Sequence, residues 1–99
     1  MAGAIGVDQA EFNNITGNFI NNSSAIAGAI LNTPNSVIGS INGSFYGNTS
    51  IDNGIETGMP GTAGGAIINI AQIGNINGNF SGNYAKAENT GGGAIFNVG

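Results

Sequence analysis

The chain has 99 residues, of which 19 are Gly, 17 Asn and 15 Ile, and its five acidic side chains against one basic side chain give a formal net charge of −4. One cation cannot neutralise the phosphates of a nucleic acid, so the composition argues against nucleic-acid binding. The sequence contains no His and no Cys, which excludes imidazole catalysis, thiol chemistry, zinc fingers and disulfides. Since 40% of the residues are hydrophobic, we expect residues 1–99 to fold as a single segment.

Two short phrases alternate along the chain and predict internal repeats. The phrase Gly-Ala-Ile recurs at 3–5, 28–30, 65–67 and 93–95, and its last three copies continue with any residue and Asn. The phrase Ile-x-Gly-x-Phe-x-x-Asn recurs at 15–22, 41–48 and 76–83, each time with an apolar residue three positions earlier. The resulting repeats are 3–27, 28–64, 65–92 and a partial 93–99.

The spacing between the phrases distinguishes a regular connection from a variable one. The connection from each Gly-Ala-Ile to the next Ile-x-Gly-x-Phe runs from position 3 to 15, from 28 to 41 and from 65 to 76, so its length is nearly constant. The connection from each Phe to the next Gly-Ala-Ile runs from position 19 to 28, from 45 to 65 and from 80 to 93, so its length varies widely. A nearly constant spacing indicates paired strands, whereas a variable spacing is typical of loops that leave and rejoin one surface.

The Ile-x-Gly-x-Phe phrases predict β-strands of about five residues, because apolar and polar residues alternate with period two. A helix is disfavoured, since Gly recurs every few residues and costs about 1 kcal/mol each time relative to Ala. Equal phrases in successive repeats favour a solenoid, in which like residues stack. The stacked columns are expected to contain Ile15, Ile41 and Ile76; Phe19, Phe45 and Phe80; and Asn22, Asn48 and Asn83. The Phe side chains should point inward while the Asn residues turn the corners and form amide ladders.

The Gly-Ala-Ile phrase should lead the chain into a strand in each coil. Its three later copies consist of Gly28, Ala29 and Ile30; Gly65, Ala66 and Ile67; and Gly93, Ala94 and Ile95. The predicted fold is therefore all-β, a parallel β-helix solenoid of three to four coils. Its two uncapped ends would expose unpaired backbone groups. We expect these ends to be covered by adjoining coils of a longer chain or by copies of the same chain.

The alternation of Gly-Gly-Ala-Ile (64–67, 92–95) with Phe-x-x-Asn (19–22, 45–48, 80–83) resembles the repeats of chlamydial polymorphic outer-membrane proteins. It is also similar to the passenger regions of autotransporter-type adhesins. The resemblance implies a right-handed β-helix, location at the bacterial cell surface or outside the cell, and adhesion to a host receptor or glycan rather than catalysis. The chain departs from the pattern at Ala2 and Ala27, which replace the leading Gly.

Acidic residues are the remaining candidates for chemistry. Asp52 and Glu56 lie in the longest variable connection, where they would bind a hard cation or act as acid and base on a glycoside. The competing interpretation, which we prefer, is a pair of solvated charges in a candidate binding loop. We therefore expect no catalytic residue, metal or cofactor. No apolar run reaches the roughly 18 residues of a membrane-spanning helix, and no signal peptide is visible at residues 1–6.

These observations leave three functional hypotheses. The first is a non-enzymatic structural protein of the bacterial surface or secreted fraction, which displays variable loops for adhesion. The second is a subunit that stacks end to end into a filament, with residues 3–5 of one copy joining 93–95 of the next. The third is a polysaccharide-binding or lyase-like β-helix. Scattered acidic residues without Arg or His make this third hypothesis the least favoured.

Overall fold

A computed structural model describes residues 2–24, 26–51, 64–86 and 93–97. Its strands are β1 (Ile5–Val7), β2 (Glu11–Ile20), β3 (Ser23–Ser24), β4 (Ile30–Asn32), β5 (Val37–Tyr46), β6 (Thr49–Ile51), β7 (Ile67–Asn69), β8 (Gln72–Ser81), β9 (Tyr84–Lys86) and β10 (Ile95–Asn97). The described residues contain no helix. The expectation of an all-β chain is confirmed.

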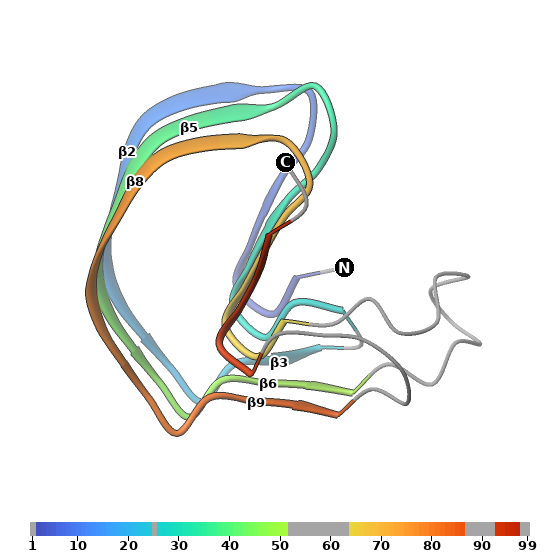
Figure 1. The fold of residues 1–99 in the computed structure, drawn as a ribbon, viewed down its shortest axis with the longest axis vertical. Coiled ribbons are helices and arrows are strands. Elements are labelled where there is room, and N and C mark those ends of the chain that lie inside the picture. The colour runs from blue at the N-terminus through green and yellow to red at the C-terminus, as the bar shows by residue number, and fades with distance from the viewer. Residues whose placement is uncertain (1, 25, 52–63, 87–92, 98–99) are drawn as a thin grey trace.

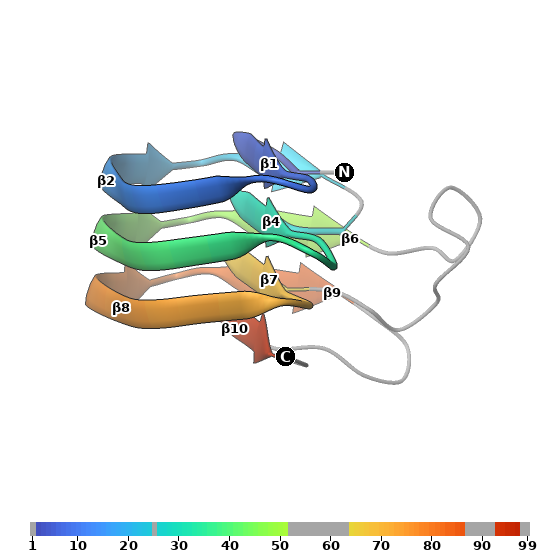
Figure 2. The same cartoon turned by 90° about the horizontal axis from the view of Figure 1, so that it is seen from above.

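The strands form three sheets, and every pairing is parallel. The first sheet has the order β1-β4-β7-β10, the second β2-β5-β8 and the third β3-β6-β9. Each sheet thus takes every third strand of the chain, so successive passes lie on top of one another (Figures 1 and 2). The fourth strand of the first sheet, β10, has no counterpart in the other two sheets among the described residues.

The pairing register places like residues on like residues. In the second sheet the isoleucines, glycines and phenylalanines of the repeated phrase are direct Cα partners: Ile15, Ile41 and Ile76; Gly17, Gly43 and Gly78; and Phe19, Phe45 and Phe80. In the first sheet the partners are Ile5, Ile30, Ile67 and Ile95. Because a slip of one residue would turn every side chain to the opposite face, burial of these apolar columns fixes the register.

The strands of the second sheet are twice as long as the sequence predicts, with ten residues each instead of about five. Four of the five additional residues precede the Ile-x-Gly-x-Phe phrase, and one follows it. In β5, Ile38 and Ile41 are both buried although they are three residues apart. Period-two alternation cannot detect this half of the strand, because a spacing of three interrupts it.

The core lies between the first and second sheets and consists of apolar columns from all three levels. Its buried members are Val7, Ile15, Phe19, Ala29, Ile30, Ile38, Ile41, Phe45, Ala66 and Ile67. A second, smaller cluster contains Ile26, Ala27, Leu31 and Ile68. Every residue of β4 and β7 is buried, and their alternate side chains belong to these different clusters. The two inner strands of the first sheet, β4 and β7, are therefore covered on both faces.

The corner after the second sheet differs from the sequence-based expectation. The residues with positive φ there are Asn21 (55°), Gly47 (66°) and Gly82 (65°). Each immediately precedes the Asn that was expected to turn the corner. The left-handed backbone conformation, which Gly and Asn tolerate best, therefore falls one residue earlier. The following Asn is free to use its side chain for hydrogen bonds between levels.

Candidate functional site

A column of stacked phenylalanine rings joins the three levels of the second sheet. The ring centroids of Phe19 and Phe45 lie 4.8 Å apart with an interplanar angle of 8°. Those of Phe45 and Phe80 lie 4.7 Å apart at 2°. This spacing equals the separation of about 4.8 Å between neighbouring strands, so the strand register alone produces the stack. Phe45, which has a ring on each face, is fully buried, whereas Phe80 is only partly buried.

The asparagine column at the corner is a continuous amide ladder. Asn22 donates from Nδ2 to Oδ1 of Asn48 over 3.0 Å, and Asn48 donates from Nδ2 to Oδ1 of Asn83 over 2.9 Å. The main-chain N–H groups of Asn22 and Asn48 donate to the same two oxygens, over 3.1 and 3.0 Å. The Nδ2 group of Asn48 also donates to the carbonyl oxygen of Phe19 over 2.8 Å. These amides join the levels and have no titratable group for acid–base chemistry.

A second amide ladder runs through the first sheet. Asn32 donates from Nδ2 to Oδ1 of Asn69, and Asn69 donates likewise to Asn97, both over 2.8 Å. Val7 occupies the corresponding position in β1. The Oδ1 atom of Asn32 is therefore buried without a hydrogen-bond partner. This ladder is not among the features predicted from the sequence; its signal is the recurring Asn at the fifth position of the Gly-Ala-Ile phrase.

The Gly-Ala-Ile phrase brings the backbones of successive levels close together. A Cβ atom on Gly28 would lie 1.9 Å from the carbonyl oxygen of Gly65, so no other residue fits there. The following Ala29, Ile30, Ala66 and Ile67 are fully buried. The last copy lies at the open end, where Ile95 is exposed and a Cβ on Gly93 would meet nothing within 4 Å.

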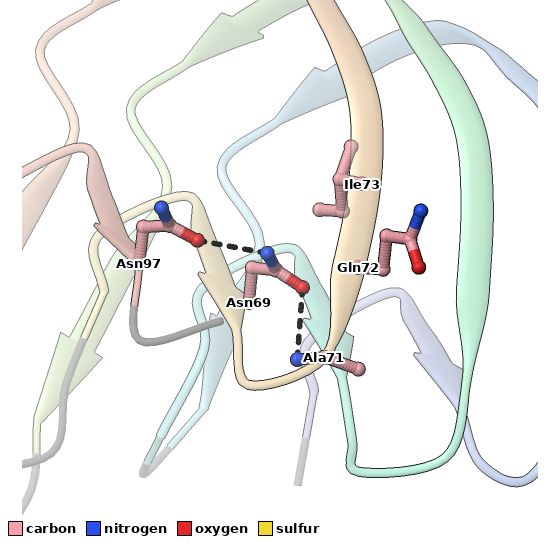
Figure 3. A pocket seen from close by; sticks show the side chains of 5 residues that line it. All are labelled: Asn69, Ala71, Gln72, Ile73 and Asn97. Atoms are coloured by element: carbon pink, nitrogen blue, oxygen red, sulfur yellow. Dashed lines mark hydrogen bonds between the residues drawn. The ribbon is translucent and has the colours of Figure 1, made fainter.

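A hollow of about 130 Å³ lies where β10 extends below β7. Its lining comes from Asn69, Ala71, Gln72, Ile73 and Asn97 (Figure 3). The Asn69 side chain already bonds to Asn97, and its Oδ1 accepts the main-chain N–H of Ala71 over 3.1 Å. Because the lining includes no titratable side chain, the hollow has no group suited to acid–base catalysis.

Of the five acidic residues, two, Asp8 and Glu11, belong to the described part of the chain. Asp52 and Glu56 lie outside the described residues. Asp8 accepts a hydrogen bond at Oδ1 from Thr33 Oγ1 over 3.0 Å, which ties the turn before β2 to the level below. Among the described residues, no three His, Cys, Asp or Glu side chains are grouped to hold a metal ion. In the same residues no helix is long and apolar enough to cross a membrane.

Comparisons with protein-family models, with curated proteins and with solved structures found no match.

Proposed function

We propose that the chain is a segment of a right-handed parallel β-solenoid with a structural, non-enzymatic role at the bacterial cell surface or in a secreted protein. Its function would be to display loops for adhesion, as in the autotransporter-type adhesins that its repeats resemble. The support is the three parallel sheets, each extended by every third strand. Stacked Phe rings and two amide ladders join the levels, which makes the stack a rigid scaffold.

A single variable connection per level carries this proposal. Strands of the second and third sheets begin at positions 11 and 23, at 37 and 49, and at 72 and 84, so this interval is identical at every level. The step from the first sheet to the second, from 5 to 11, from 30 to 37 and from 67 to 72, is nearly constant. The return from the third sheet to the first, however, runs from 23 to 30, from 49 to 67 and from 84 to 95. Since insertions are tolerated where a loop leaves and rejoins a surface, variation confined to one side indicates a display face.

The longest variable connection follows β6, and we assign adhesion to it. It begins after Ile51 and rejoins the first sheet near Gly64, whose main-chain N–H donates to the carbonyl of Ile26 over 3.2 Å. Backbone pairing fixes both points of attachment, because Ile51 pairs with Lys86 and Gly64 forms a bridge with Ala27. The acidic residues Asp52 and Glu56 would contribute to recognition of a host receptor or glycan within this loop.

Changing this loop is expected to abolish attachment without unfolding the scaffold. Bacteria displaying the chain would be compared with bacteria displaying a variant in which residues 52–61 are scrambled at constant length. We expect attachment to cultured epithelial cells or to immobilised glycans to fall at least about tenfold, because the scaffold contacts remain while the recognition sequence is lost. Circular dichroism of the purified variant should retain the β-sheet spectrum.

The matched control is Asn75→Ser on the exposed face of β8. Its column already contains Ser40, so the substitution should change neither stability nor attachment. If the scrambled variant attaches as well as the original chain, the assignment of adhesion to this loop is wrong. If Asn75→Ser abolishes attachment, the recognition surface is the outer face of the second sheet.

A further inference from the structure

The C-terminal end of the stack exposes the lower edges of β8, β9 and β10, which have no further strand beside them among the described residues. Ile76 and Phe80 are only partly buried there, whereas Ile41 and Phe45, one level above, are fully buried. At the opposite end, β1, β2 and β3 present the free edges of the same three sheets. In the second sheet the two ends carry the same Ile, Gly and Phe columns, so there each end matches the contact that already joins successive levels.

The asparagine ladder has complementary unpaired atoms at its two ends. At the C-terminal end, Asn83 donates from Nδ2 to the carbonyl of Phe45 over 3.0 Å, but no described amide oxygen lies beyond it. At the N-terminal end, Oδ1 of Asn22 accepts no hydrogen bond from a described residue. In the interior, Oδ1 of Asn48 accepts both the N–H and the Nδ2 group of the level above. Asn22 of a second copy would supply this same acceptor to Asn83.

The backbone continues the same complementarity at the corner. Asn21 donates its N–H to the carbonyl of Tyr46 over 2.9 Å, and Gly47 donates to that of Ser81 over 3.0 Å. By this series, Gly82 would donate to the carbonyl of Ile20 in a second copy. In the third sheet, Thr49 donates to the carbonyl of Asn22 and Tyr84 to that of Asn48, both over 2.8 Å. By this second series, Ser23 of the second copy would donate to the carbonyl of Asn83.

The fourth strand of the first sheet obstructs a direct join. A second copy placed with β1 against β10 would put its β2 two strand spacings below β8. That arrangement leaves a gap of about 4.8 Å more than a normal pairing below β8 and β9. The hollow lined by Asn69, Asn97 and the first residues of β8 lies on the side where this extra spacing would remain (Figure 3). The expected join of residues 3–5 to 93–95 therefore leaves the longest edge unpaired.

We propose that this chain associates head to tail by strand exchange, in which β1 of a second copy replaces β10 on the edge of β7. Ile5 of the second copy then takes the position of Ile95, and β2 pairs with β8. The exchange gives up a three-residue strand and the Asn69–Asn97 hydrogen bond. It gains a ten-residue strand pairing together with the phenylalanine and asparagine columns. Such a contact does not close on itself, so it extends into filaments, and β10 limits association in the isolated chain.

A reversible lock on β10 tests the exchange in the full chain. Ile68 and Phe96 are Cα partners in β7 and β10. Strands about 4.8 Å apart lie within the Cα separation of about 4.4–6.8 Å that a disulfide requires. Because the chain has no Cys, Ile68→Cys with Phe96→Cys gives one defined pair. We expect the reduced protein to form dimers and longer species in sedimentation velocity. Oxidation at low concentration should raise the dissociation constant at least about tenfold, and reductant should restore association.

The matched control locks two strands that do not move. Leu31 and Ile68 are partners in β4 and β7, so oxidised Leu31→Cys with Ile68→Cys should associate as the reduced form does. If the oxidised β10 lock associates equally well, or if the reduced and original chains stay monomeric over an approximately thousandfold concentration range, the exchange is wrong.

Two single substitutions test the exchange without a disulfide. Asn97→Ala removes the hydrogen bond to Asn69 and should strengthen association by loosening β10; unchanged or weaker association would contradict the exchange.

Gly93→Ala adds a Cβ in open space and should have no effect on association, because this residue leaves with β10. In a direct join the Cβ would meet the incoming backbone, as at Gly65, where it would lie 1.9 Å from the Gly93 carbonyl oxygen. Loss of association in Gly93→Ala would therefore favour the direct join. Scrambling residues 52–61 should not affect association, so this inference and the adhesion proposal fail separately.

Discussion

Gly43→Ala is expected to prevent the chain from folding or to lower its free energy of unfolding by more than about 3 kcal/mol. Gly43 has φ of +156°, and a Cβ added there would lie 1.7 Å from the carbonyl oxygen of Gly17. The backbone of β2 would have to move away, which would separate the Phe19 and Phe45 rings. A chain of this length has a total stability of only about 5–15 kcal/mol. The loss is thus a large part of the whole.

The measurement is urea unfolding followed by far-UV circular dichroism. The matched control is Gly6→Ala in β1, where the added Cβ would meet only the Cβ of Ala2 at 4.0 Å. We expect the control to change the unfolding free energy by less than about 1 kcal/mol. If Gly43→Ala unfolds at the same urea concentration as the original chain, the strands of the second sheet do not approach as closely as the structure shows.

The column structure of the second sheet is accessible to sequence reasoning because each level repeats the same side chains. Ile15 and Phe19 are spaced as Ile41 and Phe45 are, so one alignment of the phrases specifies every partner. Only one strand register buries all of these apolar side chains, since Phe in register with Phe fills the same space at each level. The Asn at the eighth position belongs to the same pattern and forms its ladder by the same register.

Other features depend on neighbours that no local pattern reveals. Leu31 and Ile68 follow another apolar residue, so nothing in their spacing assigns them to a second cluster on the far face of the first sheet. The left-handed residue at the corner varies between Asn21 and Gly47, which hides it from a search for repeated letters. The next residue is Asn at every level, and for that reason the turn was predicted there instead.

The candidate site, like the fold, is only partly predictable from the sequence. The loop containing Asp52 and Glu56 can be located from variable spacing, but those residues lie outside the described part of the chain. Whether the strands at the two ends of the stack have free edges cannot be predicted in this way, because it depends on which strands pair. The sequence contains four Gly-Ala-Ile phrases and three Ile-x-Gly-x-Phe phrases. Only the pairing of β10 with β7 shows that the surplus strand covers the edge a second copy would use.

The second large effect is expected from Asn48→Ala. Its side chain is fully buried and makes four hydrogen bonds: it donates to the Phe19 carbonyl and to Asn83 Oδ1, and it accepts two from Asn22. Alanine would remove the bonds and leave the Phe19 carbonyl and Asn22 amide groups without these partners. Since each buried group left unpaired costs about 1–3 kcal/mol, we expect a loss of about 3 kcal/mol, measured by urea unfolding.

Asn77→Ala separates the effect of the ladder from that of asparagine as a residue type. Asn77 is exposed on β8, and its side chain donates a single hydrogen bond to Asn42 over 3.2 Å. Water replaces that bond, so the expected loss is below about 0.5 kcal/mol. Hydrogen exchange in the Asn48 variant should also speed up at the main-chain N–H of Asn22, which donates to Oδ1 of Asn48 in the original chain. If the two variants lose equal amounts of unfolding free energy, the buried hydrogen bonds of Asn48 stabilise the stack no more than the exposed bond of Asn77 does.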